Sequence, residues 1–285
     1  MNSVLSPDDA IQVRPAAETP VVGEFLDFAG ERYYVIRNVE QMAPFFVSVI
    51  SAYDHWLFAS STGGLTAGRV SPETALFPYI TVDKLHDCAN STGPRTLLRV
   101  GNGTNAVYWE PFNKNQRSLS ALSCNLYKNT LGNKLCFEEI NHELELAFRY
   151  TWSTTEEYGF VRHAELENLG SLNQHVEVVD GLQNLLPAGT PIFTQTNSSN
   201  LVDAYKWTEL DESTGLAFLT LYSGITDRAE PCESLKATTV FSLGLQDHTV
   251  LISDCQLADF LQGTRLQQDI HKRGIRGAYF VNHAC

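Results

Sequence analysis

Hydrophobic and polar residues alternate strictly over Glu143–Trp152, with leucine or an aromatic residue at every second position. Successive side chains of a β-strand point to opposite faces of the sheet, so a period of two predicts one buried and one solvated face. Antiparallel strands commonly have this arrangement. The segment is therefore predicted to be a half-buried antiparallel strand.

Two pairs of short apolar runs are separated by turn-forming residues. Phe45–Ile50 and Trp56–Ala59 flank residues 52–55, whereas Thr96–Val100 and Ala106–Trp109 flank a stretch rich in glycine and asparagine. Runs separated in this way predict β-hairpins. Further strands are predicted at Arg32–Arg37, Phe160–Glu167, Gln174–Asp180, Ala217–Tyr222, Ala237–Leu243, His248–Ile252 and Arg276–His283.

Helical periodicity is confined to Asp254–Ile270, where Gly263 interrupts it. Strands with almost no helix between them predict antiparallel sheets rather than βαβ units. The predicted fold is therefore all-β, a large antiparallel β-sandwich with few helices, which forms a single domain over residues 21–285. Residues 1–20 are polar and contain prolines, and we expect them to be a poorly ordered leader.

Composition narrows the range of partners. The net charge is -13 at pH 7, whereas nucleic acids and anionic membranes are bound by basic surfaces. No apolar run approaches the about 20 residues that span a membrane. The cysteines show no paired spacing and no signal peptide is visible, which is typical of reduced thiols in a cytoplasmic protein. We expect a cytoplasmic protein that binds neither nucleic acid nor membrane.

The stretch Phe45–Tyr79 combines the residue types that contact sugars. Glycines let a ligand approach the backbone closely, an arginine offers five fixed hydrogen-bond donors, and aromatic rings offer flat apolar faces on which sugar rings stack. For the segment Gly63–Arg69, read as a loop, contact with a sugar or phosphate and a purely structural role both remain open. The carbohydrate-binding residues predicted here are Asp54, His55, Trp56, Gly63, Gly64, Arg69 and Tyr79.

Other chemistry has weaker support. Potential metal ligands are densest at Asp83, His86, Asp87 and Cys88, but no second pair of ligands accompanies them, so no metal site is predicted. Each of two i,i+2 pairs would share one face of a strand and could act as an acid and a base on a sugar. The pairs are His163 with Glu165 and His175 with Glu177. Pairs of this kind also occur on any solvent-exposed sheet face, simply because such faces are polar. No catalytic residue and no cofactor are assigned.

Four stretches, in this order, resemble the N-terminal β-sandwich domain of cellobiose and chitobiose phosphorylase-like proteins. The resemblance extends over most of residues 30–283, and the order of the stretches is more specific than any one of them. The stretches are SVISAYDHWLFASSTGGLTAGRVSPETALFPY, ELELAFRYTWSTTEEYGFVRHAELENLG, VEVVDGLQNLLPAG and RGIRGAYFVNH.

The resemblance implies a galactose-mutarotase-like supersandwich, which in full-length relatives precedes a helical barrel that carries the catalytic acid. It also implies homodimer contacts and, through the parent enzyme, an oligosaccharide or sugar phosphate together with inorganic phosphate. The sequence ends at Cys285 directly after a predicted strand, so we expect an N-terminal fragment of a longer chain. Leu65, Thr66 and Ala67 stand where the phosphorylases have aromatic residues after the glycine pair.

Three hypotheses follow. The first is a non-catalytic carbohydrate-associated domain of a glycoside phosphorylase or hydrolase, which supports and dimerises a helical barrel absent from this sequence. The second is a stand-alone aldose epimerase that uses His163, His175 and either Glu165 or Glu177. The third is a protein-interaction platform without affinity for sugar.

Overall fold

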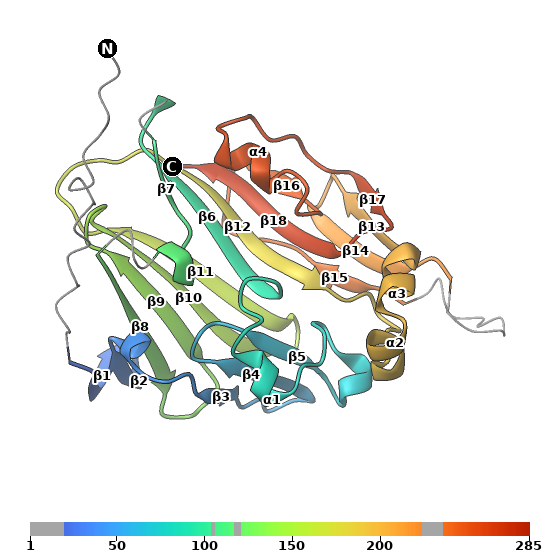
Figure 1. Cartoon of the computed structure of the whole chain (residues 1–285), viewed down its shortest axis with the longest axis horizontal. Coiled ribbons are helices and arrows are strands. Elements are labelled where there is room, and N and C mark those ends of the chain that lie inside the picture. The colour runs from blue at the N-terminus through green and yellow to red at the C-terminus, as the bar shows by residue number, and fades with distance from the viewer. Residues whose placement is uncertain (1–19, 104–105, 117–120, 224–235) are drawn as a thin grey trace, which may run out of the picture.

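The computed structural model describes residues 20–103, 106–116, 121–223 and 236–285. These residues form four antiparallel β-sheets connected by loops and short helices (Figure 1). The prediction of an all-β protein with few helices is confirmed at this level. The predicted leader, apart from Pro20, lies outside the described residues.

The largest sheet has six strands in the spatial order β1-β2-β8-β9-β10-β11 and lies at the left of Figure 1. Chain neighbours pair with each other throughout, except that β2 pairs with β8 across a long excursion of the chain. That excursion contains the three-stranded sheet. The six strands are β1 (Val22–Phe28), β2 (Glu31–Arg37), β8 (Leu122–Asn129), β9 (Leu135–Asn141), β10 (Leu146–Thr155) and β11 (Gly159–Asn168).

The other three sheets have five, four and three strands, in the orders β16-β18-β12-β6-β7, β15-β14-β13-β17 and β3-β4-β5. The five-stranded sheet contains β6 (Gly93–Val100), β7 (Val107–Trp109), β12 (Val176–Leu185), β16 (Thr249–Leu251) and β18 (Gly277–Ala284). The four-stranded sheet contains β13 (Lys206–Asp211), β14 (Leu216–Leu221), β15 (Thr238–Val240) and β17 (His271–Arg273). The three-stranded sheet contains β3 (Phe46–Val49), β4 (His55–Ser60) and β5 (Leu65–Arg69).

Both predicted hairpins form, as β3–β4 and β6–β7. The predicted helix at Asp254–Ile270 is mostly wrong, because only Leu257–Leu261 is helical and Gly263 follows it with φ +72°. A left-handed glycine beyond the last turn is a common helix stop. The described α-helices are α1 (Val82–Leu85), α2 (Ile192–Asn197), α3 (Ser199–Tyr205) and α4 (Leu257–Leu261), and the short 3₁₀ turns are η1 (Val39–Gln41), η2 (Pro72–Thr74) and η4 (Lys114–Gln116).

One cluster of buried side chains contains residues from all four sheets. Trp152 of β10, Leu98 of β6, Leu219 of β14 and Leu57 of β4 all belong to it, and each is at most 1 % exposed. Burial of aliphatic and aromatic side chains is the main favourable term in folding. The sheets are therefore held against one another chiefly by apolar contact.

Two boundaries differ from the sequence prediction. The strand predicted from Glu143 begins at Leu146, because Glu145 has a left-handed φ of 52° and closes the preceding turn. The segment Gly63–Arg69 is not a loop, since Leu65–Arg69 forms β5 and pairs with β4. Glycine in a sequence usually predicts a loop, but Gly68 lies inside β5, where the indole of Trp56 packs against it.

The second face of β10, predicted to be solvated, carries a buried charge network. Arg149 forms ion pairs with Glu138 of β9 and with Glu167 of β11. Asn125 and Tyr127 of β8 also donate to Oε2 of Glu138, at 2.5 and 2.7 Å. Burial raises the pKa of Glu138, but these donors and the adjacent guanidinium outweigh it, so the pKa lies below its ordinary value.

This network predicts how stability depends on pH. A carboxyl group whose pKa is depressed in the folded state stabilises the fold above its unfolded pKa, and that contribution is lost as the pH falls through the folded value. Glu138→Gln is expected to lower the free energy of unfolding at pH 7 by about 1–3 kcal/mol. Urea denaturation should also show a smaller loss of stability for the variant than for wild type between about pH 5 and about pH 3. If the free energy of unfolding fell by the same amount in both proteins over this pH range, Glu138 would not have the depressed pKa.

Candidate functional site

Asp54 and Arg69 form an ion pair where the β4–β5 hairpin opens. Nη2 of Arg69 lies 2.9 and 3.0 Å from the two carboxylate oxygens of Asp54, and Nε lies 3.1 Å from one of them. The side chains are 61 % and 41 % exposed, so the pair contributes little to stability. It instead leaves charged hydrogen-bonding groups at the solvent-facing rim of the sheet.

A row of aromatic side chains covers the outer face of the three-stranded sheet. We define the aromatic row as Phe46, Phe58, Trp56 and Tyr79, whose successive ring centroids lie 5.4, 5.8 and 5.8 Å apart. Strand alternation produces this face, because the intervening side chains of β3 and β4 point into the core. Phe46 and Tyr79 remain 42 % and 38 % exposed, so the ends of the row are accessible to solvent.

Gly68 provides the space that Trp56 occupies. The two residues face each other across β4 and β5, and a Cβ at position 68 would lie 2.5 Å from Cζ2 of the indole. The same Cβ would lie 2.7 Å from the Cα of Ala75 and from the carbonyl oxygen of Thr74. Glycine is therefore required at position 68 for the indole to lie across β5.

His55 does not face this surface. Its side chain is on the opposite face of β4 and is 8 % exposed, and its ring packs edge-on against Phe160 with centroids 5.1 Å apart. Burial, assisted by the nearby Arg69 guanidinium, lowers the pKa of His55. The imidazole is thus a neutral packing residue, and its prediction as a carbohydrate contact has no geometric support from the outer face.

Gly63 and Gly64 lie at the far end of the same hairpin, roughly 16–20 Å from Asp54 along β4. Gly63 turns the chain with φ +93°, and a Cβ on Gly64 would lie 2.1 Å from the carbonyl oxygen of Leu85. Close packing against the α1 segment therefore accounts for the second glycine. The predicted residues consequently divide between two places rather than forming one site.

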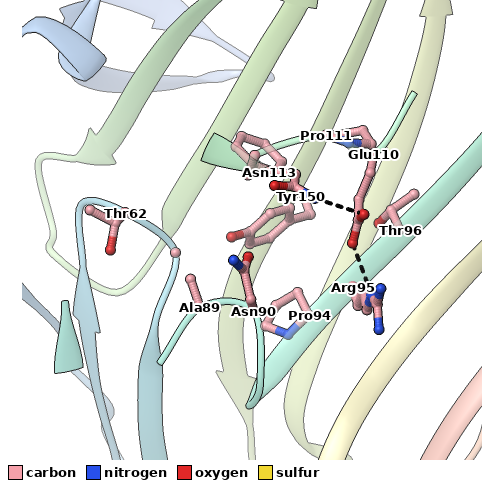
Figure 2. Close-up of a pocket in the computed structure, with 12 residues that line it drawn as sticks. Thr62, Ala89, Asn90, Pro94, Arg95, Thr96, Glu110, Pro111, Asn113 and Tyr150 are labelled. Carbon is pink, nitrogen blue, oxygen red and sulfur yellow. Dashed lines mark hydrogen bonds and ion pairs between the residues drawn. The ribbon is translucent and has the colours of Figure 1, made fainter. Parts of the chain in front are cut away.

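Gly63 lines a small polar cavity between the hairpin turn, β6 and β10 (Figure 2). On one side of it Glu110 accepts hydrogen bonds from Arg95 at 2.9 Å and from Asn113 at 2.8 Å. Tyr150 lies between this group and the turn, and burial raises the pKa of its hydroxyl. The cavity, which is partly open to solvent, has a volume of about 30 Å³. This is enough for a water molecule but too small for a sugar ring.

The two histidine–carboxylate pairs lie on different sheets. His163 and Glu165 are exposed on β11, whereas His175 and Glu177 lie at the start of β12, with 3.9 Å between Nε2 and Oε1. Glu177 also forms an ion pair with Arg99 at 3.1 Å. Within the described residues, no hydrogen bond or ion pair joins one pair to the other. The epimerase hypothesis needs an acid and a base in one site, and this geometry does not bring the two pairs together.

The potential metal ligands near α1 are also dispersed. Nδ1 of His86 lies 2.7 Å from Oγ of Ser60, and the Cys88 thiol is buried and donates to the carbonyl oxygen of Leu85. Across the part of the chain that the structure describes, no three histidine, cysteine or acidic side chains converge as a metal site would require. His86 therefore joins the α1 segment to the β4–β5 turn, whereas the Cys88 hydrogen bond lies within that segment.

A second aromatic surface, not predicted from the sequence, lies on the four-stranded sheet. Trp207 of β13, Phe218 of β14 and His271 of β17 line an open groove of about 470 Å³. These residues come from separate segments, and only the pairing of β13 with β14 and β17 brings them together. The strand expected at Ala217–Tyr222 identified one wall, but neither β13 nor β17 was predicted.

Comparison with protein-family models gave no match for this chain, and a search of curated proteins found no significant relative. Within the described ranges, no helix is both long enough and apolar enough to cross a membrane. Functional inference therefore depends on the surfaces described above.

Proposed function

We propose that this chain is a non-catalytic carbohydrate-binding β-domain whose aromatic row receives an oligosaccharide. The supporting observation is the row itself, with partly exposed rings in succession on one face of a sheet. The steps between ring centroids are similar in length to one pyranose unit of a β-1,4-linked chain. The planes of Trp56 and Phe58 differ by only 29°, so two neighbouring sugar rings can pack their apolar faces on them, whereas Tyr79, at 79° to the indole, flanks the end of the row.

Polar groups at the rim complement the rings. Arg69 ends β5 opposite His55, on the other face of the hairpin from Trp56, and its 61 % exposed side chain pairs with Asp54 where the hairpin opens. The pair leaves exposed nitrogen donors and carboxylate acceptors at this rim of the sheet. Sugar hydroxyls both donate and accept hydrogen bonds, so they match this mixed pair. Of the residues predicted from the sequence, Trp56 and Tyr79 belong to the aromatic row, and Asp54 and Arg69 flank it at the rim of the sheet. His55, Gly63 and Gly64 position the hairpin.

We infer that the four sheets form a supersandwich of the galactose-mutarotase type and that the domain belongs to a cytoplasmic glycoside phosphorylase or hydrolase. In that setting it supports a helical barrel and its dimer, and the barrel binds the phosphate or sugar phosphate. The all-β architecture and the shared apolar cluster agree with this arrangement.

Replacing Trp56 is expected to remove most of the saccharide affinity. Stacking on an aromatic ring contributes on the order of 1–1.5 kcal/mol, so Trp56→Ala should weaken binding of cellotetraose by about tenfold. Isothermal titration calorimetry of wild type and variant measures this change. Phe25→Ala is a matched control, because Phe25 is an exposed aromatic residue on β1 of another sheet.

The same titration distinguishes sugar binding from a protein-interaction role. If the aromatic row serves only a protein partner, wild type will not bind cellotetraose or chitotetraose, and Trp56→Ala will change only self-association in sedimentation experiments. That outcome would overturn the proposed function. Equal affinities of wild type and Trp56→Ala for cellotetraose would also overturn it.

A further inference from the structure

The groove on the four-stranded sheet has the features of a separate ligand site. Its floor is aromatic, with Trp207 and Phe218 on neighbouring strands, and His271 stacks on the indole with 6.3 Å between ring centroids and 15° between planes. Glu209 follows on the same face of β13, two residues after Trp207 and directly opposite His271. The groove therefore places a flat apolar surface beside a carboxylate and an imidazole.

Arg273 is held at the edge of this surface by two aromatic rings. Its Cζ lies 5.5 Å from the ring centroid of Trp207 and 4.6 Å from that of Tyr222. Cation–π contacts of this kind fix a guanidinium without using its in-plane N–H donors. Among the described residues, no carboxylate pairs with the Arg273 guanidinium and no group accepts a hydrogen bond from it. Arg273 does not line the groove itself but lies opposite Trp207 at its end, where the guanidinium is available to an anionic group of a ligand that extends past the indole.

The carboxylates of the groove are not equivalent. Asp211 accepts hydrogen bonds from the backbone and side chain of Ser213 and from Thr214, so it closes its own turn. Glu209 has no hydrogen-bond partner within the described segments and is exposed. An ionised carboxylate only accepts hydrogen bonds, so a ligand that complements Glu209 must present donors such as hydroxyl groups.

We propose that this groove binds a saccharide that carries a carboxylate, such as a hexuronate. The apolar face of the sugar ring packs on the aromatic floor formed by Trp207 and Phe218, its hydroxyls donate to Glu209, and its carboxylate pairs with Arg273. A planar carboxylate matches the edge of one guanidinium in a bidentate manner. Glu209 and Asp211 repel any anion, and they repel a phosphate ester, with nearly two negative charges, more strongly than a carboxylate with one. Pairing with Arg273 must outweigh this smaller repulsion for the hexuronate to be preferred over a neutral sugar. This site is distinct from the aromatic row and does not depend on it.

Methyl β-D-glucuronide and methyl β-D-glucoside are matched probes, because they differ only in the carboxylate. Calorimetry of the whole chain should show about tenfold tighter binding of the glucuronide. Arg273→Gln should remove this preference, and Trp207→Ala should weaken binding of both probes. Arg276→Gln, which removes an exposed charge three residues away, should leave both affinities unchanged.

Several results would overturn the assignment: no binding of the glucuronide by wild type, an unchanged preference in Arg273→Gln, or tighter binding of glucose 6-phosphate than of the glucuronide. Cellotetraose titrations separate this inference from the proposed function. Trp207→Ala should retain cellotetraose binding at the aromatic row, and Trp56→Ala should retain glucuronide binding at the groove. Each proposal can therefore fail without the other.

Discussion

Arg162→Leu is expected to lower the free energy of unfolding by about 3–5 kcal/mol, because it leaves a largely buried carboxylate without its cation. Arg162 of β11 donates to both oxygens of Asp180 on β12, at 2.7 and 2.9 Å. The side chains are 7 % and 15 % exposed, and the guanidinium also lies 4.8 Å from the ring centroid of Tyr150. This ion pair directly connects the six-stranded and five-stranded sheets.

Urea denaturation followed by circular dichroism measures this loss. The double variant Arg162→Leu with Asp180→Leu is the informative control, since replacing both members of a buried pair by apolar residues is often close to neutral. The double variant should therefore be more stable than the single one. A loss below about 1 kcal/mol in the single variant would show that the pair behaves as an exposed one and does not hold the sheets together.

Gly68→Val is expected to reduce both stability and saccharide binding. Added side-chain atoms would overlap the backbone near Ala75 and the indole of Trp56, and backbone cannot move aside as a flexible side chain can. Overpacking of this kind destabilises by about 3 kcal/mol. Because Trp56 must leave its place over β5, affinity for cellotetraose should fall along with the midpoint of thermal unfolding.

Ser48→Val is the matched control for this substitution. Ser48 lies on the same outer face, in β3, and is only partly buried, so a valine there should change stability by less than about 0.5 kcal/mol. If Gly68→Val were as stable as Ser48→Val and kept full affinity, Gly68 would not be what positions the indole.

The sequence pattern predicts strands well where one face is apolar and turn residues bound the segment, as at β2, β11 and β18. It fails at β8 and β9, whose interior positions include Asn125, Glu138 and Glu139. These polar side chains are at most 5 % exposed. Polar residues in a sequence predict solvent-exposed positions. These side chains can be buried only because the fold brings hydrogen-bonding and charged partners such as Arg149 next to them.

The candidate sites show the same division between local and non-local information. Trp56 and Tyr79 belong to one compact stretch, so their proximity could be anticipated, and their rings do meet at 5.8 Å. Trp207, His271 and Arg273 come from β13 and β17, which are far apart in sequence and short. Their meeting depends on strand pairing that no local pattern specifies.

The most direct test of carbohydrate binding at the aromatic row uses the indole N–H signals of the four tryptophans in a ¹H–¹⁵N NMR spectrum. Trp109 and Trp152 are 2 % and 1 % exposed and serve as internal references. On titration with cellotetraose, the signal of Trp56 should move progressively while those of Trp109 and Trp152 stay in place. A Trp56 signal that does not move at the highest cellotetraose concentration would contradict the proposed site.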